Sequence, residues 1–146
     1  MIGLIVFAGV AYGLVAIGRA GPYLAWLVVR HGRQTRALEA LVRANPADAT
    51  AHRDLAQLWL VRRRPGRALR HVAAAQARDP DDLELAYLAA QARLARGEHA
   101  IAAEALQAIA ARDPRFRYGE PILRAADALA ALGRWTEAEA ALRQFA

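Results

Sequence analysis

A repeat of 34 residues is the feature that most constrains how this chain folds. Three Asn-Pro or Asp-Pro steps, at Pro46, Pro80 and Pro114, follow one another at intervals of 34 residues. The residues before them also match, as "VRANP", "QARDP" and "AARDP". Self-similarity at a fixed period of this length is typical of repeat architectures. The spacing therefore predicts a row of similar units.

Two helical segments joined by a turn are predicted between consecutive prolines. They read "DATAHRDLAQLWLVRR", "PG" and "RALRHVAAAQAR" in the first unit, and "LELAYLAAQARLAR", "GE" and "HAIAAEALQAIAAR" in the second. Apolar residues recur at helical spacing, as at Leu55, Leu58 and Trp59. Each proline lacks a backbone N–H and restricts the residue before it, so it separates one unit from the next. Thr136 and Glu139 form a T-x-x-E capping box, which predicts that the last helix begins near Thr136.

The pattern resembles the tetratricopeptide repeat family over about residues 34–146. The matching positions are small residues in the first helix, glycines at the turn, small residues opening the second helix and two aromatic sites. They are Ala56, Ala90, Gly97, Gly133, Ala68, Ala102, Ala138, Trp59 and Trp135. The resemblance implies an all-α fold, an α-α solenoid of about three helical hairpins. Its parts would be a half repeat at 34–46 and repeats at about 47–80, 81–114 and 115–146.

The repeats depart from the family pattern in two places. Arg63 stands where the turn glycine of the first repeat is expected. The third repeat carries two extra residues, which we place in "RFRYGEP" at 115–121, with a helix restarting near Pro121. Counting back one unit from Pro46 predicts a further second helix over Gln34–Ala44, with Leu38 and Leu41 facing inward.

The resemblance also implies that the first helices line a groove that binds peptides or proteins. The expected lining residues are Thr50, Arg53, Gln57, Leu60, Glu84, Tyr87, Leu88, Gln91, Glu120, Arg124 and Asp127. The alternative for each is an ordinary solvated helix face. Chaperone-binding members hold a C-terminal carboxylate with basic and asparagine residues. Only Arg53 and Arg124 fit that pattern, so we do not expect a complete clamp.

Residues 1–18 contain no charged side chain and predict a membrane-spanning helix. At about 1.5 Å per residue they reach about 27 Å, close to the hydrocarbon thickness of a bilayer. A signal peptide would need a basic segment ahead of its apolar run, and three repeats offer no cavity for a buried helix. All 20 basic residues are arginine, a bias typical of a GC-rich, bacterial genome. Because the nearest arginines follow the span, we expect a single pass through the bacterial inner membrane, with the N-terminus outside and the repeats cytoplasmic.

Residues 19–33 are predicted to form an interfacial helix that joins the anchor to the repeats. Arg19 can reach the lipid headgroups, Pro22 suits the first turn of a helix, and Tyr23 and Trp26 suit the interfacial belt. An anchor followed by cytoplasmic repeats resembles membrane-anchored bacterial members of the family, such as the lipopolysaccharide-assembly regulators. The metal-binding cysteines of those regulators are missing here, so no residue is carried over from them.

Positive charge is concentrated in the half of the chain nearest the anchor. Residues 1–78 hold twelve arginines and three acidic residues, and residues 79–146 hold eight and eleven. Near an anionic leaflet each arginine would contribute about 1 kcal/mol. The expected lipid contacts are Arg19, Arg30, Arg33, Arg36, Arg62, Arg63, Arg64, Arg67 and Arg70. A solvated turn is the plain alternative, and contact with nucleic acid ranks lower because no recognition motif accompanies these residues.

The composition removes several kinds of catalytic chemistry, and nothing in the sequence argues for catalysis. Serine, cysteine and lysine are absent, which removes the usual hydroxyl and thiolate nucleophiles and Schiff-base chemistry. The histidines, His31, His52, His71 and His99, lack metal-ligand spacing and are interpreted as helix-surface residues. The run "DPDD" at 79–82 predicts a helix N-terminus, because it lacks the glycine and distal glutamate of a calcium loop. We expect no enzyme activity, no cofactor and no metal.

The sequence as a whole predicts a membrane-anchored adaptor or scaffold for protein–protein interaction at the cytoplasmic face of the inner membrane. The partner would bind the groove or the open C-terminal end, where Leu142 and Phe145 leave apolar surface. A second copy of the chain could cover that end and form a homo-oligomer. The main alternative is an integral accessory subunit of a larger membrane complex, and a soluble basic nucleic-acid binder is less favoured.

Overall fold

The computed structural model describes residues 32–143, which are helical apart from the turns between helices. The chain divides into two compact units, residues 1–37 and 38–146. Residues 32–37 of the first unit are helical, and so are residues 38–44 at the start of the second. The remaining elements are α2 (Ala49–Val61), α3 (Pro65–Gln76), α4 (Leu83–Ala95), α5 (His99–Arg112), the short η1 (Phe116–Gly119), α6 (Glu120–Ala131) and α7 (Trp135–Arg143).

The predicted membrane span at 1–18 lies outside the described residues, as do Arg19, Arg30 and most of the predicted joint at 19–33. Among residues 32–143, no helix combines the length and the apolar character that crossing a membrane requires.

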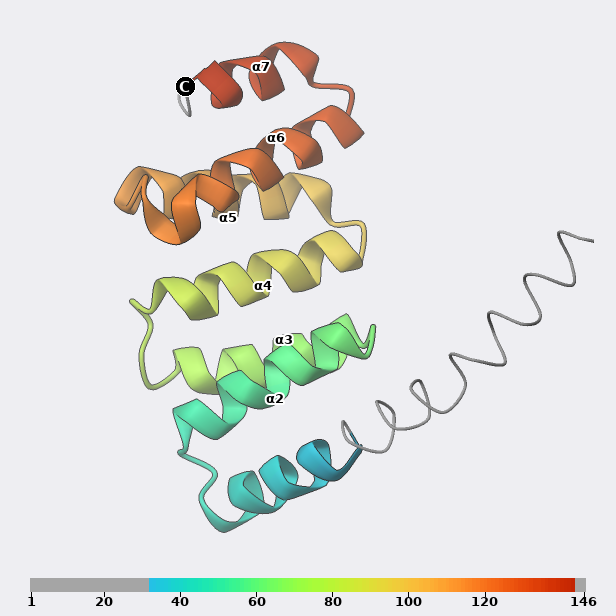
Figure 1. The fold of residues 1–146 in the computed structure, drawn as a ribbon, viewed down its shortest axis with the longest axis vertical. Coiled ribbons are helices and arrows are strands. Elements are labelled where there is room, and N and C mark those ends of the chain that lie inside the picture. The colour runs from blue at the N-terminus through green and yellow to red at the C-terminus, as the bar shows by residue number, and fades with distance from the viewer. Residues whose placement is uncertain (1–31, 144–146) are drawn as a thin grey trace, which may run out of the picture. The chain divides into compact units, whose positions relative to one another are not determined.

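Helices α2 to α7 stack in chain order, which is the arrangement of an α-solenoid (Figure 1). Each helix packs mainly against its neighbours in sequence. The small residues predicted at the helix contacts are fully buried, namely Ala56, Ala68, Ala90 and Ala102. A methyl side chain lets two backbones approach closely, so these positions confirm the predicted hairpins.

The three turns between paired helices share one conformation. Arg63, Gly97 and Gly133 have φ angles of 55°, 77° and 74°, in the left-handed region. In each turn the next residue donates its backbone N–H to the carbonyl five residues earlier, at 2.8 Å in the first turn and 2.9 Å in the other two. This hydrogen bond closes the helix C-terminus and favours glycine at the left-handed position. The predicted equivalence of Arg63 with the turn glycines is confirmed.

The helix starts follow local side-chain chemistry. Asp82 caps α4 by accepting the backbone N–H of Glu84 at 2.7 Å, which confirms the helix start predicted at "DPDD". The helix predicted near Pro121 begins at Glu120. The Pro65-Gly66 step differs from the prediction, because it opens α3 instead of forming the turn. A proline fits the first helical turn, where its missing N–H has no partner to lose.

The predictions for Leu41, Thr136 and Trp135 are wrong. Leu38 packs against the core as predicted, but Leu41 is 52% exposed and Val42 packs inward in its place. Residues three or four apart share a helix face, so helical spacing alone allowed Leu38 to face inward together with either Leu41 or Val42. Thr136 does not cap the last helix, because α7 begins one residue earlier, at Trp135. The Trp135 side chain is 68% exposed and fills no aromatic site between helices.

Candidate protein-binding face

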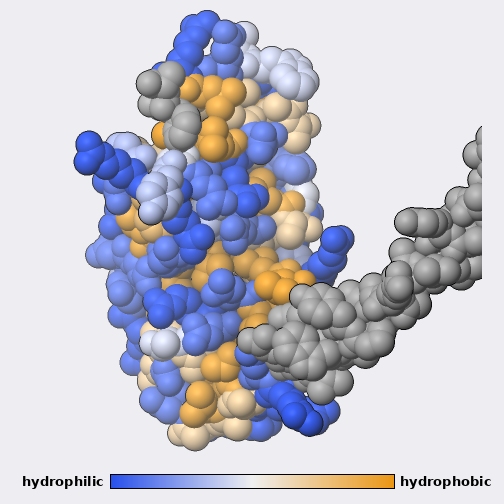
Figure 2. All heavy atoms as spheres, viewed as in Figure 1, coloured by the Kyte–Doolittle hydropathy of each residue, from blue (hydrophilic) through white to orange (hydrophobic). Residues whose placement is uncertain are grey.

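The predicted groove residues lie on the first helix of each pair. Their surface on α2, α4 and α6 is called here the first-helix face; it carries Arg53, Gln57, Leu60, Glu84, Gln91, Glu120, Arg124 and Asp127. Leu88 is only 5% exposed and Tyr87 is fully buried, and both pack in the core, so the prediction that they line this face is wrong. In the view of Figure 2, hydrophobic patches are separated by hydrophilic residues. The surface in this view therefore combines charge with small apolar contacts.

A network of ion pairs joins η1 to α4 and α6. Arg117 makes a bidentate contact with Glu84, with Nε 3.1 Å from Oε1 and Nη2 2.7 Å from Oε2. Arg124 Nη2 lies 2.8 Å from Glu120 Oε1. Bidentate guanidinium–carboxylate pairs fix geometry as well as adding energy. These side chains are half-exposed, so we attribute to them mainly the positioning of η1.

Tyr87 is the centre of this network. Its buried ring and that of Phe116 form a T-shaped pair with a centroid distance of 5.8 Å, and the Arg117 guanidinium lies 4.9 Å from the Tyr87 centroid. Its hydroxyl accepts a hydrogen bond from Arg124 Nε at 3.0 Å. Burial raises the pKa of Tyr87, and hydrogen bonding to Glu120 raises it further. The same bond from Tyr87, together with Arg124, holds the pKa of Glu120 below its ordinary value.

The backbone of η1 is strained. Arg117, Tyr118 and Gly119 follow one another in the left-handed region, with φ angles of 48°, 57° and 78°. For a residue other than glycine this conformation costs about 1–2 kcal/mol. The contacts of Phe116 and Arg117 with α4 offset that cost. They leave the Tyr118 side chain 96% exposed beside the first-helix face.

This loop was missed as a functional element by the sequence analysis. The one available signal was the pair of extra residues in 115–121, which marks an insertion without showing what it contacts. Strained backbone that is held by its surroundings is found often at ligand clamps and binding sites. The loop therefore belongs to the candidate site.

The ion pairing at the α2 end of the face is weaker than at the η1 end. Arg53 Nη1 lies 4.0 Å from Asp82 Oδ2, at the rim of a pocket of about 130 Å³ that Thr50 also lines. Arg124, the other predicted clamp residue, is engaged by Glu120 and Tyr87. A peptide carboxylate would have to displace these partners.

Five of the predicted lipid-binding arginines lie in the α2–α3 turn or on the first two turns of α3. The guanidinium groups of Arg62 and Arg67 lie 5.0 Å and 4.6 Å from the centroid of the Trp59 ring. Arg63, Arg64 and Arg70 are exposed. Arg33 and Arg36 are exposed too and belong to the first unit.

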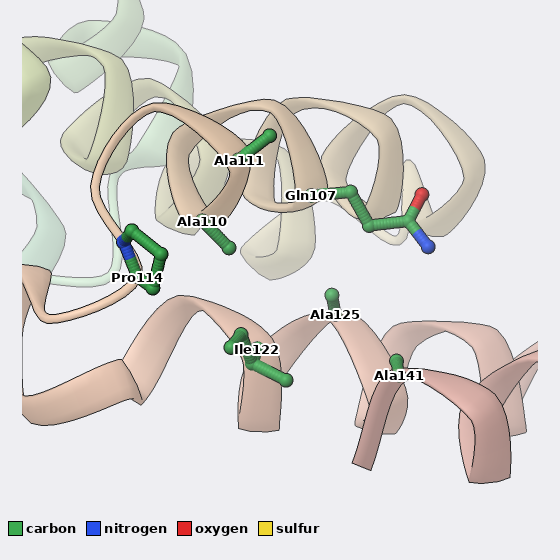
Figure 3. Close-up of a pocket in the computed structure, with 7 residues that line it drawn as sticks. All are labelled: Gln107, Ala110, Ala111, Pro114, Ile122, Ala125 and Ala141. Carbon is green, nitrogen blue, oxygen red and sulfur yellow. The ribbon is translucent and has the colours of Figure 1, made fainter. Parts of the chain in front are cut away.

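An apolar pocket of about 240 Å³ lies between α5, α6 and α7. Figure 3 shows Ala110 and Ala111 of α5 on one side, with Ile122 and Ala125 of α6 opposite. Four of its seven lining residues are alanines, so the short side chains leave the space open. Leu142 on α7 is exposed nearby in sequence, while Phe145 lies outside the described residues.

In the described range 32–143, no three acidic or histidine side chains form a group that could hold a metal ion.

The stacked hairpins and their turns define an α-solenoid of the tetratricopeptide-repeat type. Among solved structures, that of MamA, a protein with this type of fold, superposes with a TM-score of 0.69 at 19% sequence identity. The match covers 76% of this chain and 64% of MamA, so the chain spans less than two thirds of that protein. At this identity the likeness shows the fold alone. No protein-family model and no curated protein matches the sequence.

Proposed function

We propose that the chain is a non-enzymatic adaptor that binds a protein partner across the first-helix face. The observation that carries this proposal is the loop at 116–119, which presents Tyr118 to solvent from a strained but firmly held backbone. Tyrosine is enriched at the centres of protein interfaces, because it offers a large contact area at low cost in conformational entropy. A fixed loop would not have to be ordered when the partner binds.

The alternating charges of the face support a partner of mixed charge. Glu84 and Arg117 lie side by side, as do Glu120 and Arg124, and Arg53 is only loosely paired. Complementary charges on a partner would set its orientation more than its affinity. The proposed partner therefore contributes an apolar contact for Tyr118, flanked by both acidic and basic residues.

The proposal includes an N-terminal membrane anchor and repeats on the cytoplasmic side of a bacterial inner membrane. Its support is the uncharged run at 1–18 and the excess of arginine in residues 1–78. Tethering the repeats to the membrane raises their effective concentration toward other membrane proteins. Partition of the full-length chain after carbonate washing tests the anchor, and its release into the soluble fraction would contradict it.

Site-specific photo-crosslinking tests the partner face. A photoreactive residue placed at Tyr118 should give a discrete crosslinked protein in native membranes, identified by mass spectrometry. The matched control is the same residue at Ala73, which is exposed on α3, a second helix. Equal crosslinking from both positions would count against the first-helix face.

A second proposal, an accessory subunit of a membrane complex, draws on the last repeat. Trp135 and Leu142 are exposed on α7, and the apolar pocket of Figure 3 adjoins this helix. Exposed apolar surface of this kind marks interaction sites. Co-purification at fixed stoichiometry in high salt would favour this function, and a monomer in detergent would count against it. Salt-dependent binding to RNA or DNA would instead favour the nucleic-acid alternative.

A further inference from the structure

A polar pocket lies between the helical segment 38–44, α2 and α3. It has a volume of about 330 Å³ and is lined by Glu39, Trp59, Arg67, Arg70 and His71. Within the described part of the chain, neither Arg67 nor Arg70 forms an ion pair. Among residues 32–143, the pocket thus holds two guanidinium groups without an ion-pair partner, and Glu39 is its one carboxylate.

His71 is held in this pocket by a second histidine. His71 Nδ1 lies 3.0 Å from His52 Nδ1, and His52 Nε2 lies 3.2 Å from the carbonyl oxygen of Pro46. His52 is only 7% exposed, so its interpretation as a surface residue is wrong. It follows Pro46 by six residues and occupies the buried side of α2.

The hydrogen-bond chain fixes the tautomers of both rings. A carbonyl oxygen only accepts, so His52 Nε2 carries a hydrogen, and in neutral His52 the Nδ1 atom is an acceptor. His71 Nδ1 must then be the donor between the two rings. Neutral His71 has no second hydrogen, which leaves its Nε2 as an acceptor. A fully deprotonated oxyanion offers only hydrogen-bond acceptors. It therefore cannot hydrogen-bond to His71 Nε2 until that nitrogen is protonated.

Protonation of His71 at Nε2 would add a third cationic donor to the pocket without breaking its bond to His52. In the empty pocket burial lowers the pKa of His71, and the neighbouring His52 and Arg70 lower it further, against an opposing effect of Glu39. The pocket therefore has a neutral His71 near pH 7 when it is empty. A bound anion reverses the balance of charge around the ring and favours the imidazolium.

We propose that this pocket binds a tetrahedral dianion of the phosphate monoester class, held by Arg67, Arg70 and His71, and that His71 takes up one proton on binding. The titratable and charged groups around His71 are then His52 from α2, Glu39 from the helical segment 38–44, and Arg67 and Arg70 from α3. The ligand is either a soluble phosphate monoester or the headgroup of a phosphatidate lipid. This site goes beyond the adaptor function and does not depend on the anchor or on the first-helix face.

Sulfate is the probe that tests the proton coupling, because it remains a dianion throughout the neutral pH range. Calorimetric titration of the full-length chain in non-ionic detergent should show tighter binding as the pH falls. Uptake of one proton per anion gives up to about a tenfold change in affinity for one pH unit, between about pH 7.5 and 6.5. Binding that is independent of pH, or no binding, would overturn the proposal.

Charge-matched variants separate a built site from the general attraction of a basic turn. Arg70→Gln should weaken sulfate binding about tenfold or more. Arg64→Gln removes an equal charge from the N-cap position of α3, six residues before Arg70 and outside the pocket lining, so it should have less than about a twofold effect. Equal losses in the two variants would overturn the site. Circular dichroism confirms that each variant is folded.

Two further variants test the roles of the titrating groups. Glu39→Gln should strengthen sulfate binding, because it removes the one negative charge from the pocket. His71→Asn keeps an amide donor for His52 but cannot gain a proton, so the pH dependence should disappear. A pH dependence that survives in His71→Asn would show that another group takes up the proton and would overturn the assignment.

The source of the anion is resolved by competition against sulfate. The chain is placed in nanodiscs of phosphatidylcholine alone or of phosphatidylcholine and phosphatidate in a four-to-one ratio. If sulfate binds more weakly in the disc that contains phosphatidate, and Arg70→Gln shows no such difference between the two discs, the ligand is the lipid headgroup. Displacement of sulfate by glycerol 3-phosphate in the first disc identifies a soluble ligand. Failure of both competitors would overturn the phosphate monoester class.

Discussion

The α2–α3 turn and the 116–119 loop both place residues other than glycine in the left-handed region, but they differ in what holds them there. Arg63 occupies a turn position at which the later repeats have Gly97 and Gly133, and its side chain is exposed. Arg117 instead reaches Glu84 and the Tyr87 ring, 33 and 30 residues earlier in the chain. The strain at Arg63 is thus local. The strain at Arg117 is coupled to long-range contacts.

The largest effect is expected from removing the centre of those contacts. Tyr87→Ala should lower the free energy of unfolding by about 3–5 kcal/mol, because it leaves a cavity beneath Phe116 and Arg117. Urea denaturation of the full-length chain in detergent, followed by helical circular dichroism, measures it. Tyr87→Phe is the control and should cost about 1 kcal/mol, for the lost hydroxyl bonds. A loss below 1 kcal/mol in Tyr87→Ala would show that the loop is held by something else.

Breaking the ion pair without touching the loop backbone should have a smaller effect. Glu84→Gln is expected to cost about 1 kcal/mol, since it removes the bidentate partner of Arg117. Glu139→Gln is the matched control, because Glu139 pairs with Arg143 on the exposed surface of α7 and should contribute a few tenths of a kcal/mol. Similar losses in both variants, again by urea denaturation, would mean that the Arg117 contact is an ordinary surface pair.

Glycine substitutions compare the two strained positions directly. Arg63→Gly should raise the free energy of unfolding by about 0.5–1 kcal/mol, because relief of the left-handed strain exceeds the added entropy of the unfolded chain. Arg117→Gly relieves the same strain but loses the contacts with Glu84 and Tyr87, so it should give no gain. Equal stabilisation by the two substitutions would remove the distinction drawn between the two sites.

The smallest effect concerns pH and the His52–His71 pair between α2 and α3. The pKa of His71 is lower in the folded chain than in the unfolded one, so the unfolded chain binds more protons as the pH falls. Stability from this group should be fully present above about pH 6.5 and decline as the pH drops through that value. Thermal midpoints in sulfate-free and phosphate-free buffer measure it, and His71→Asn should flatten the curve. A midpoint that rises on acidification would show that the folded chain binds more protons than the unfolded one and would contradict the lowered pKa of His71.

Local signals predicted the solenoid well. The repeated prolines, the turn glycines and the Asp82 cap act within a few residues, so their spacing could be interpreted directly. His52 also carried such a signal, because it stands three residues before Leu55 and seven before Trp59, on the buried side of the same helix. Composition suggested a surface histidine, but helical periodicity was the better guide.

The contacts of the candidate site could not be predicted in the same way. Nothing near Arg117 in the sequence indicates that its partner is Glu84, because the pair forms only when the folded chain brings η1 to the first turn of α4. The choice between Leu41 and Val42 as the inward residue likewise depended on how one helix rotates against the next. Such choices are made by packing across helices and leave no trace in a period of 34 residues.

The two extra residues of the third repeat have a consequence for how proteins of this kind can diversify. Their length is taken up within 116–119, and α6 still buries Ala125 and Leu129 as a first helix should. Each helix packs mainly on its sequence neighbours, so a change in length here stays within one repeat and does not disturb the core around α2 and α3. Insertions and substitutions at this loop can therefore change the shape offered to a partner, while the scaffold that carries it is inherited unchanged.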